Sequence, residues 1–351
     1  MVIKMKILVD IMSGDNAPLA TLKGAADSAA EYSKEKFVFI GNERIIKETA
    51  RKENINIDLD NITIVHTEQV VTMEDNALSV VREKKDSSMG VGLKMLAEGD
   101  GDAFVSAGNT GALHAGSTLI VRRIKGLRKS AIGSVIPYAN PTLLIDSGAN
   151  IEIDPQTYVQ FAHMGTVYMK KMFGLDDPRV GLLNIGAEEH KGTKNVVEAY
   201  KLLKAEKSIN FVGNVEGKEI PSGACDIIVT DGFSGNILLK LTEGCASYFV
   251  GKIKDVFNKS AVTKISGLMI KNNMKQLKKE LNASEYGGAP LLGLSKTVIK
   301  AHGSSDAYAI KNAIKQAIKC ASSGVVVDIA KRLVPELSSK EQTSSEKDGT
   351  L

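Results

Sequence analysis

The feature that most constrains the fold of this chain is a unit that recurs along it. Each unit is a short apolar run, then a loop of small polar residues, then a helical pattern. Residues 103–105 form such a run, the loop Ser106–Ala112 follows, and a helical pattern continues over 113–121. Strands that alternate with helices predict an α/β fold whose mainly parallel sheet is covered on both faces. Ligands of such sheets bind at the carboxyl ends of the strands.

The same pattern gives the expected elements and their order. Strands are expected at 6–11, 37–40, 62–65, 103–105, 132–136, 143–145, 180–183, 210–212, 227–229 and 297–300, with 132–136 and 143–145 as an antiparallel pair. Helices are expected at 20–33, 43–52, 77–84, 91–97, 113–121, 155–172, 196–205 and 307–321. No linker divides the chain before its end, so we expect one α/β domain over 1–337. The polar, aperiodic residues 338–351 predict a disordered tail.

Composition narrows the class of protein further. The 351 residues are 43% hydrophobic and 25% charged, as in ordinary globular proteins, and the formal charge of +4 is too small to indicate a nucleic-acid partner. The cysteines Cys225, Cys245 and Cys320 are widely spaced, which predicts free thiols in a reducing cytoplasm and no zinc site. The N-terminus lacks a secretory signal pattern, and no run approaches the roughly 20 apolar residues of a spanning helix. Any membrane contact is therefore expected at the surface.

The loop Ser106–Ala112 has the composition of an anion-binding turn. Gly108 and Gly111 remove side-chain bulk and permit positive φ, and free N–H groups at a helix start point at anions. Asn109 and Thr110 can donate hydrogen bonds to a ligand oxygen, or they can cap the helix that follows. A plain strand-to-helix turn remains an alternative for the whole loop.

Residues 252–282 form a basic helical insertion that differs from the repeated unit. The apolar residues Ile253, Val256, Phe257, Ala261 and Ile265 fall on one helical face, and Leu268 and Met269 extend the set. We expect Gly267 and the pair Asn272–Asn273 to interrupt the helix. Eight lysines and only two acids lie among them. A basic amphipathic helix can lie on an anionic membrane; packing on the domain or across a dimer is the alternative.

Seven segments, taken together, carry a resemblance to a known family. They are Ser13–Pro18, Lys84–Met89, Ser106–Leu113, Pro178–Gly186, Asp231–Asn236, Tyr286–Gly293 and Lys300–Asp306. In this order they resemble the PlsX family of acyl-carrier-protein:phosphate acyltransferases over about residues 5–335. The chain departs from the family pattern at Ser13, Ser147, Ala187 and within 71–76, which affects the expected loop shapes and not the expected reaction.

The resemblance implies a fold, a reaction and partners. The implied fold is a Rossmann-like α/β/α sandwich related to phosphate acetyltransferases. The implied reaction moves a long fatty acyl group from acyl carrier protein to inorganic phosphate, and the acyl phosphate then feeds a membrane acyltransferase in phospholipid synthesis. A homodimer, located in the cytoplasm and peripherally attached to the membrane, is also implied. Phosphate is itself a nucleophile, so neither a Ser-His-Asp triad nor a cofactor is expected, and no metal is expected since no carboxylate cluster surrounds Asp146.

The residues then divide by expected role. Catalysis is assigned to Lys191, which matches a lysine of the family motif and supplies positive charge, to His302, which could protonate the leaving thiolate, and to Asn109. Phosphate or thioester binding is assigned to Gly108, Thr110, Gly111, Asp15, Asn16, Asp231, Asn236, Ser304 and Ser305. A solvated lysine, a structural histidine and helix caps are the alternatives for these residues.

Two surfaces are expected to meet larger partners. The run Arg122, Arg123, Lys125, Arg128 and Lys129 is predicted to dock the acidic carrier protein, with a solvated charged turn as the alternative. Membrane contact is predicted for Val256, Phe257, Ile265, Leu268 and Met269. Two other functions compete with acyl transfer from the carrier: a phosphate acetyltransferase-like enzyme that uses acyl coenzyme A, and a membrane-bound scaffold without activity.

Overall fold

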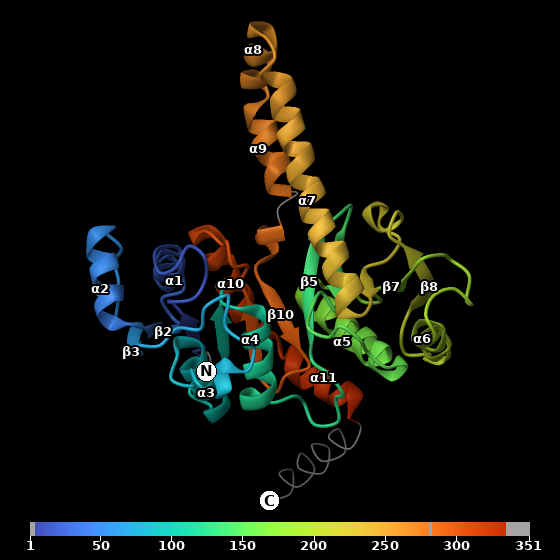
Figure 1. The fold of residues 1–351 in the computed structure, drawn as a ribbon, viewed down its shortest axis with the longest axis horizontal. Coiled ribbons are helices and arrows are strands. Elements are labelled where there is room, and N and C mark those ends of the chain that lie inside the picture. The colour runs from blue at the N-terminus through green and yellow to red at the C-terminus, as the bar shows by residue number, and fades with distance from the viewer. Residues whose placement is uncertain (1–3, 281–282, 335–351) are drawn as a thin grey trace, which may run out of the picture.

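The computed structural model describes residues 4–280 and 283–334, and Figure 1 shows a broad body from which one helical arm projects. The predicted tail 338–351 and both ends of the predicted domain lie outside these residues. The strands are β1 (Lys6–Asp10), β2 (Lys36–Gly41), β3 (Ile62–His66), β4 (Ala103–Ser106), β5 (Ala131–Pro137), β6 (Pro141–Ile145), β7 (Val180–Asn184), β8 (Phe211–Glu216), β9 (Ile227–Val229), β10 (Ala289–Leu292) and β11 (Thr297–Lys300). The helices are α1 (Leu19–Glu31), α2 (Glu43–Lys52), α3 (Ser88–Glu98), α4 (Thr110–Gly116), α5 (Pro155–Phe173), α6 (Lys194–Ala205), α7 (Gly232–Phe257), α8 (Ala261–Met269), α9 (Lys271–Glu280), α10 (Ala307–Ser323) and α11 (Val325–Leu333).

The described strands form one sheet of eleven, in the order β3-β2-β1-β4-β11-β10-β5-β6-β9-β7-β8. Two parallel blocks, β3-β2-β1-β4-β11 and β6-β9-β7-β8, are joined through β10 and β5, each antiparallel to both of its neighbours. The two blocks therefore run antiparallel to each other. This corrects the expectation that all the polar loops share the carboxyl edge of one parallel sheet, because the loops fall into two groups.

Helices cover both faces of each block, as strand alternation requires. On β1, Ile7 and Val9 pack with α1 and α10, whereas Leu8 packs on the other face with α3 and α4. In the second block, Leu143 packs with α5 and Leu144 packs with α7. The predicted Rossmann-like α/β/α class is confirmed, with a mixed join at the centre of the sheet.

Several predicted boundaries differ from the structure for local reasons. The expected helix 77–84 is only a 3₁₀ turn over Ser79–Val81. The expected helix 113–121 begins earlier, because Asn109 caps it, and its last turn, Ser117–Val121, is π-helical before Arg122 takes φ +72°. Neither β10 nor α11 was predicted from the sequence pattern. Strand β10 has only four residues, one of them a proline.

The arm is longer than the predicted insertion 252–282. It is made of α7, whose 26 residues start in the body, and of α8 and α9, which return beside it (Figure 1). The predicted apolar face is broken at Ser260, which caps α8, and the expected interruptions Gly267 and Asn272–Asn273 lie inside α8 and α9. Among the described helices, none combines the length and the apolar content that crossing a membrane requires.

Candidate active site

The loops that follow β1, β4 and β11 meet beside one another in the first block. The N–H of Asp15 donates to the carbonyl of Gly303 at 2.8 Å, and the amide of Asn16 donates to the carbonyls of Ser304 and Ser305 at 3.0 and 3.2 Å. Asp15, Asn16 and Ser304 are exposed, and Ser305 is buried. The structure thus brings together the first and last of the predicted binding loops, which are almost 300 residues apart in sequence.

The loop of β4 is held by Asn109. Its Oδ1 accepts from the N–H of Ala112 at 3.0 Å, so Asn109 is the N-cap of α4, and its Nδ2 donates to three carbonyls within 72–75 at 3.0–3.3 Å. The backbone N–H groups of Thr110 and Gly111 donate to no described group, and both residues are exposed. Both readings of the loop therefore coexist: Asn109 caps the helix, and the first N–H groups of α4 stay open to an anion.

Gly108 and Gly111 have different reasons to be glycine. A Cβ on Gly108 would lie 2.7 Å from Met89 and 2.8 Å from Ser13, so no side chain fits there. A Cβ on Gly111 would lie 3.3 Å from its nearest neighbours, which is tight but not impossible. Neither glycine has positive φ, so the expected conformational reason is wrong and close packing is the reason for Gly108.

Beneath these loops lies a row of polar residues to which the sequence analysis assigned no individual role. Asp10, Ser106 and Lys300 end the adjacent strands β1, β4 and β11, and their side chains are 1%, 1% and 8% exposed. Burial raises the pKa of Asp10 and lowers the pKa of Lys300 to about 8. The sequence did contain a signal for this row, because a polar residue ends each of three apolar strands. A polar side chain that is buried at such a position needs a hydrogen-bond or charge partner.

His302 stands at the exposed side of the same group of loops. Its Nδ1 lies 2.8 Å from Ser304 Oγ and accepts the backbone N–H of Ser304 at 3.2 Å. Because that N–H can only donate, Nδ1 is unprotonated in this geometry, and the neutral ring carries its proton on Nε2. His302 can therefore present an N–H to a substrate.

The second group of loops follows β6 and β9. Asp146 is fully buried and accepts five hydrogen bonds, from the backbone of Ile132, Gly148, Ala149 and Asn150 and from the Asn150 amide. Its oxygens are occupied, so it shapes the loop. Among the described residues, no group of three or more His, Cys, Asp or Glu could hold a metal ion, and the expectation of no metal stays a prediction.

Asp231 and Asn236, both predicted to bind substrate, belong to this second group. Asp231 caps α7 by accepting from the N–H of Ser234 at 2.8 Å, which is the cap alternative. The Asn236 amide lies against Gly148, since a Cβ there would be 3.1 Å from its nitrogen. No described hydrogen bond or ion pair links Asp231 or Asn236 to the loops of β1, β4 and β11.

Helix α4 connects the two groups. It starts at the β4 loop, and His114, five residues after its cap, lies 3.1 Å from Ser130 Oγ, next to β5. Ser130 in turn accepts from the Asn150 amide through its carbonyl at 2.7 Å. Five residues of helix rise only about 8 Å, so the two groups border the same short helix. Burial lowers the pKa of His114, which favours a neutral ring at this junction.

Lys191 lies further out in the second block, in the loop after β7. Its backbone carbonyl accepts from the Asn184 amide at 3.0 Å, and its side chain is partly buried. No described carboxylate pairs with its ammonium, and no described contact links it to Asn109 or His302. The structure therefore does not bring the three predicted catalytic residues together.

The predicted carrier-docking run lies between α4 and β5. Arg128 pairs with Asp154 at 3.2 Å, and the Arg123 guanidinium donates to the carbonyl of Arg128. Arg122 and Lys125 are exposed, and no described carboxylate pairs with them, whereas Lys129 is partly buried. Two of the five cations are thus engaged within the chain, and Arg122 and Lys125 are the most open to a partner.

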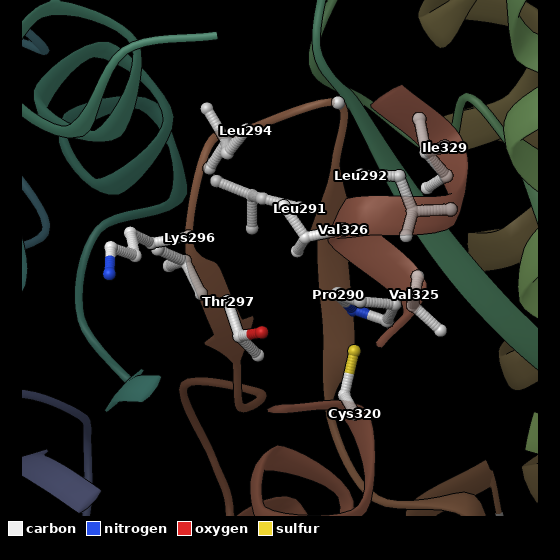
Figure 2. Close-up of a pocket in the computed structure, with 12 residues that line it drawn as sticks. Pro290, Leu291, Leu292, Leu294, Lys296, Thr297, Cys320, Val325, Val326 and Ile329 are labelled. Carbon is white, nitrogen blue, oxygen red and sulfur yellow. The ribbon is translucent and has the colours of Figure 1, made fainter. Parts of the chain in front are cut away.

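The enclosed cavity in Figure 2 is not part of this site. It lies between the β10–β11 hairpin, the end of α10 and α11, and Leu292, Cys320, Val325 and Ile329 are among its lining residues. Its volume of about 10 Å³ has room for one water molecule at most, far below the size of a ligand pocket. It is a small packing defect between these strands and helices.

The fold is that of the phosphotransacetylases. A phosphotransacetylase from Streptococcus pyogenes superposes with a TM-score of 0.59 at 16% identity, covering 91% of this chain and 94% of that one. The EutD phosphotransacetylase from Staphylococcus aureus gives 0.57 at 18% identity, with the same coverage. At these identities the likeness shows the class of fold alone.

Sequence relatives define the family. The model of a family described as fatty acid synthesis protein matches residues 5–328. A phosphate acyltransferase of Acetivibrio thermocellus is 46% identical over 94% of this chain and 97% of its own length. One of Clostridioides difficile is 46% identical over 93% of this chain and 95% of its own length. The chain belongs to this family of phosphate acyltransferases, the PlsX family, and is an acyltransferase.

Proposed function

We propose that this enzyme transfers a long-chain fatty acyl group from acyl carrier protein to inorganic phosphate. The observation that carries the proposal is the meeting of the β1, β4 and β11 loops around open N–H groups at the start of α4, on the fold of the phosphotransacetylases. Such N–H groups favour a phosphate or a developing oxyanion. The family names of the relatives support the phosphate acceptor, and the acyl phosphate product suits phospholipid synthesis.

The reaction needs positioning more than a protein nucleophile. A phosphate oxygen attacks the thioester carbonyl, a tetrahedral oxyanion forms, and the C–S bond breaks to give acyl phosphate and a thiolate. The proton that the thiolate takes up is the one that the attacking hydrogen phosphate releases, and the proposed role of His302 is to donate a hydrogen bond from Nε2 to the leaving sulfur as this proton is transferred. Burial raises the pKa of Cys225 to about 12 and of Cys320 to about 11, so both thiols stay protonated near neutral pH and are poor nucleophiles.

The direct test is product formation. The protein is incubated with palmitoyl-carrier protein and inorganic phosphate, and acyl phosphate is trapped with hydroxylamine. We expect a hydroxamate that depends on both substrates. No hydroxamate with the carrier substrate, together with activity on acetyl coenzyme A, would establish the phosphate acetyltransferase-like alternative, and inactivity with both would favour the scaffold.

Carrier docking is proposed for the basic run before β5. The carrier is acidic, and Arg122 and Lys125 present exposed cations. Reversing both to Glu should raise the KM for the carrier substrate by about tenfold and leave the KM for phosphate unchanged. Arg128→Ala serves as a comparison because Arg128 already pairs with Asp154. An unchanged carrier KM would contradict the docking site.

We propose that the protein binds peripherally to the inner face of the membrane through the outer end of its helical arm. At its outer end Ile265, Leu268 and Met269 are 62%, 68% and 80% exposed, and exposed lysines stand along α7, α8 and α9. Phe257 differs from the other predicted contacts because it is partly buried and packs against Gly267. An apolar tip flanked by lysines suits the surface of an anionic membrane, where a membrane acyltransferase could take the product.

A further inference from the structure

The buried row Asp10, Ser106 and Lys300 has a geometry that the reaction as described does not use. Lys300 pairs with Ser106 in the register of β11 and β4, and Asp10 follows the pair Val9–Val105 in the register of β1 and β4. The three residues are thus side by side at the ends of neighbouring parallel strands. Side chains two residues apart on a strand point to the same face of the sheet. Two residues before the row lie Leu8, Phe104 and Val298, which all pack in the core beneath α3 and α4. The row therefore faces α4.

The row holds one peptide group from both sides. Lys300 Nζ donates to the carbonyl of Ala107 at 3.4 Å and also to the carbonyl of Ala301. The N–H of Gly108, at the other end of the same peptide group, donates to Ser106 Oγ at 3.1 Å. The Ser106 hydroxyl in turn donates a hydrogen bond to Asp10 Oδ2 at 2.7 Å. The carbonyl and the N–H of the Ala107–Gly108 peptide are therefore both fixed by buried side chains.

This peptide group immediately precedes the cap Asn109 and the open N–H groups of Thr110 and Gly111. Lys300 also ties the β4 loop to the β11 loop, where His302 stands two residues later. We propose that Lys300 is a positioning residue for the acyl transfer: its buried ammonium, with Ser106 and Asp10, fixes the Ala107–Gly108 peptide and so sets the orientation of the anion-binding loop. This proposal rests on the proposed function for its catalytic readout only.

The charge of Lys300 depends on pH. Burial lowers its pKa to about 8, and Asp15 and Asp10 oppose that shift. These two carboxylates, both from β1 and the loop after it, are the charged groups that face Lys300; β4 and its loop contribute the uncharged Ser106 and the Ala107 carbonyl. The ammonium holds the two carbonyls more strongly than the neutral amine does, so its loss as the pH rises through about 8 should weaken the clamp and lower turnover.

The test compares Lys300→Met with Lys94→Met, the same substitution at an exposed lysine of α3. Turnover and the KM for phosphate are measured from pH 6 to 10 with palmitoyl-carrier protein. We expect turnover of both the wild type and Lys94→Met to fall above about pH 8. Lys300→Met should be roughly 100-fold slower at pH 7 and should lack that fall, because a loop misplaced by about 1 Å costs about this much. A fall of the same size and midpoint in Lys300→Met would overturn the proposal.

A second readout does not need activity. Hydrogen exchange of the segment 104–113, followed by mass spectrometry on the intact protein at pH 7, reports the clamp on the Gly108 N–H. We expect exchange of this segment to be at least about tenfold faster in Lys300→Met than in Lys94→Met, with segments outside the β4 and β11 loops unchanged. Unchanged exchange would contradict the clamp even in an active enzyme. If the wild type makes no acyl phosphate but the two variants still differ in exchange, the proposed function is contradicted and the clamp by Lys300 is supported.

Discussion

Asn109 shows at the residue scale how one side chain serves two structural tasks beside a reactive site. Its Oδ1 caps α4 while its Nδ2 holds the carbonyls of 72–75, so both ends of the amide are occupied. The segment 71–76 departs from the family pattern, and it is the segment that this amide holds in place. Asn109 thus holds the loop together, and the proposal that the N–H groups of Thr110 and Gly111 bind the ligand does not need its side chain to be free.

Lys191 gives the sharpest residue-scale prediction, because the structure separates it from Asn109 and His302. If it supplies the positive charge proposed from the family motif, Lys191→Ala should lower turnover by roughly 100-fold while the fold stays intact. Lys194→Ala, at an exposed lysine three residues away, is the matched control. Turnover is measured by hydroxamate trapping and the fold by circular dichroism. Near-normal turnover of Lys191→Ala would assign the lysine to the loop alone.

At the scale of elements, the arm shows why helix ends matter to function. Ser260 accepts from the N–H of Thr263 and forms a capping box with it, which ends the continuity between α7 and α8. After this break the chain forms α8, which lies at the outer end of the arm (Figure 1). Its residues Val262, Ile265, Leu268 and Met269 are 62–80% exposed. The sequence predicted one helical face over 253–265 and interruptions only at Gly267 and Asn272–Asn273, so the break at Ser260 was not anticipated.

Membrane binding by the tip predicts the effect of Leu268→Glu. Withdrawing one leucine from the bilayer surface costs about 2 kcal/mol, so binding to liposomes that contain anionic lipid should weaken at least about tenfold. Activity in solution should not change. Val327→Glu introduces the same charge at a half-exposed apolar position of α11 in the body and should bind as the wild type does. Co-sedimentation measures both; equal binding by Leu268→Glu would place the arm's apolar residues in protein packing.

The assembly of the whole molecule is suggested by a second apolar surface, which lies on the part of α7 that is nearer to the body. Phe233, Ile237, Leu241 and Tyr248 recur at helical spacing and are 53–62% exposed. Exposed apolar stripes of this length commonly mark protein interfaces, and a two-fold axis would place each residue in the interface twice. We propose that the homodimer implied by the family forms along this stripe.

The dimer is tested with Leu241→Glu against Lys240→Glu, its neighbour on α7. Because the buried charge would occur twice in a symmetric interface, the dimer should dissociate roughly 100-fold more readily in Leu241→Glu. Lys240→Glu, also exposed, should remain as the wild type. Light scattering over a concentration series gives the mass. A dimer that persists in Leu241→Glu would move the interface to another face.

The α/β class, most strand and helix positions and the family could all be predicted from the amino-acid sequence. These follow from local periodicity and from motifs, which need no knowledge of contacts. The sequence also marked the loops of β1, β4 and β11 as polar and led to the prediction that they bind a ligand.

Only the tertiary structure decided which of these loops meet. The antiparallel β10 and β5 reverse the second block, so Asp231 and Lys191 stand apart from His302, a separation that no local pattern encodes. The row Asp10, Ser106 and Lys300 likewise becomes visible only when three strands distant in sequence lie in register. The physical reason is that buried polar side chains must find partners across the sheet, and strand order determines which partners they find.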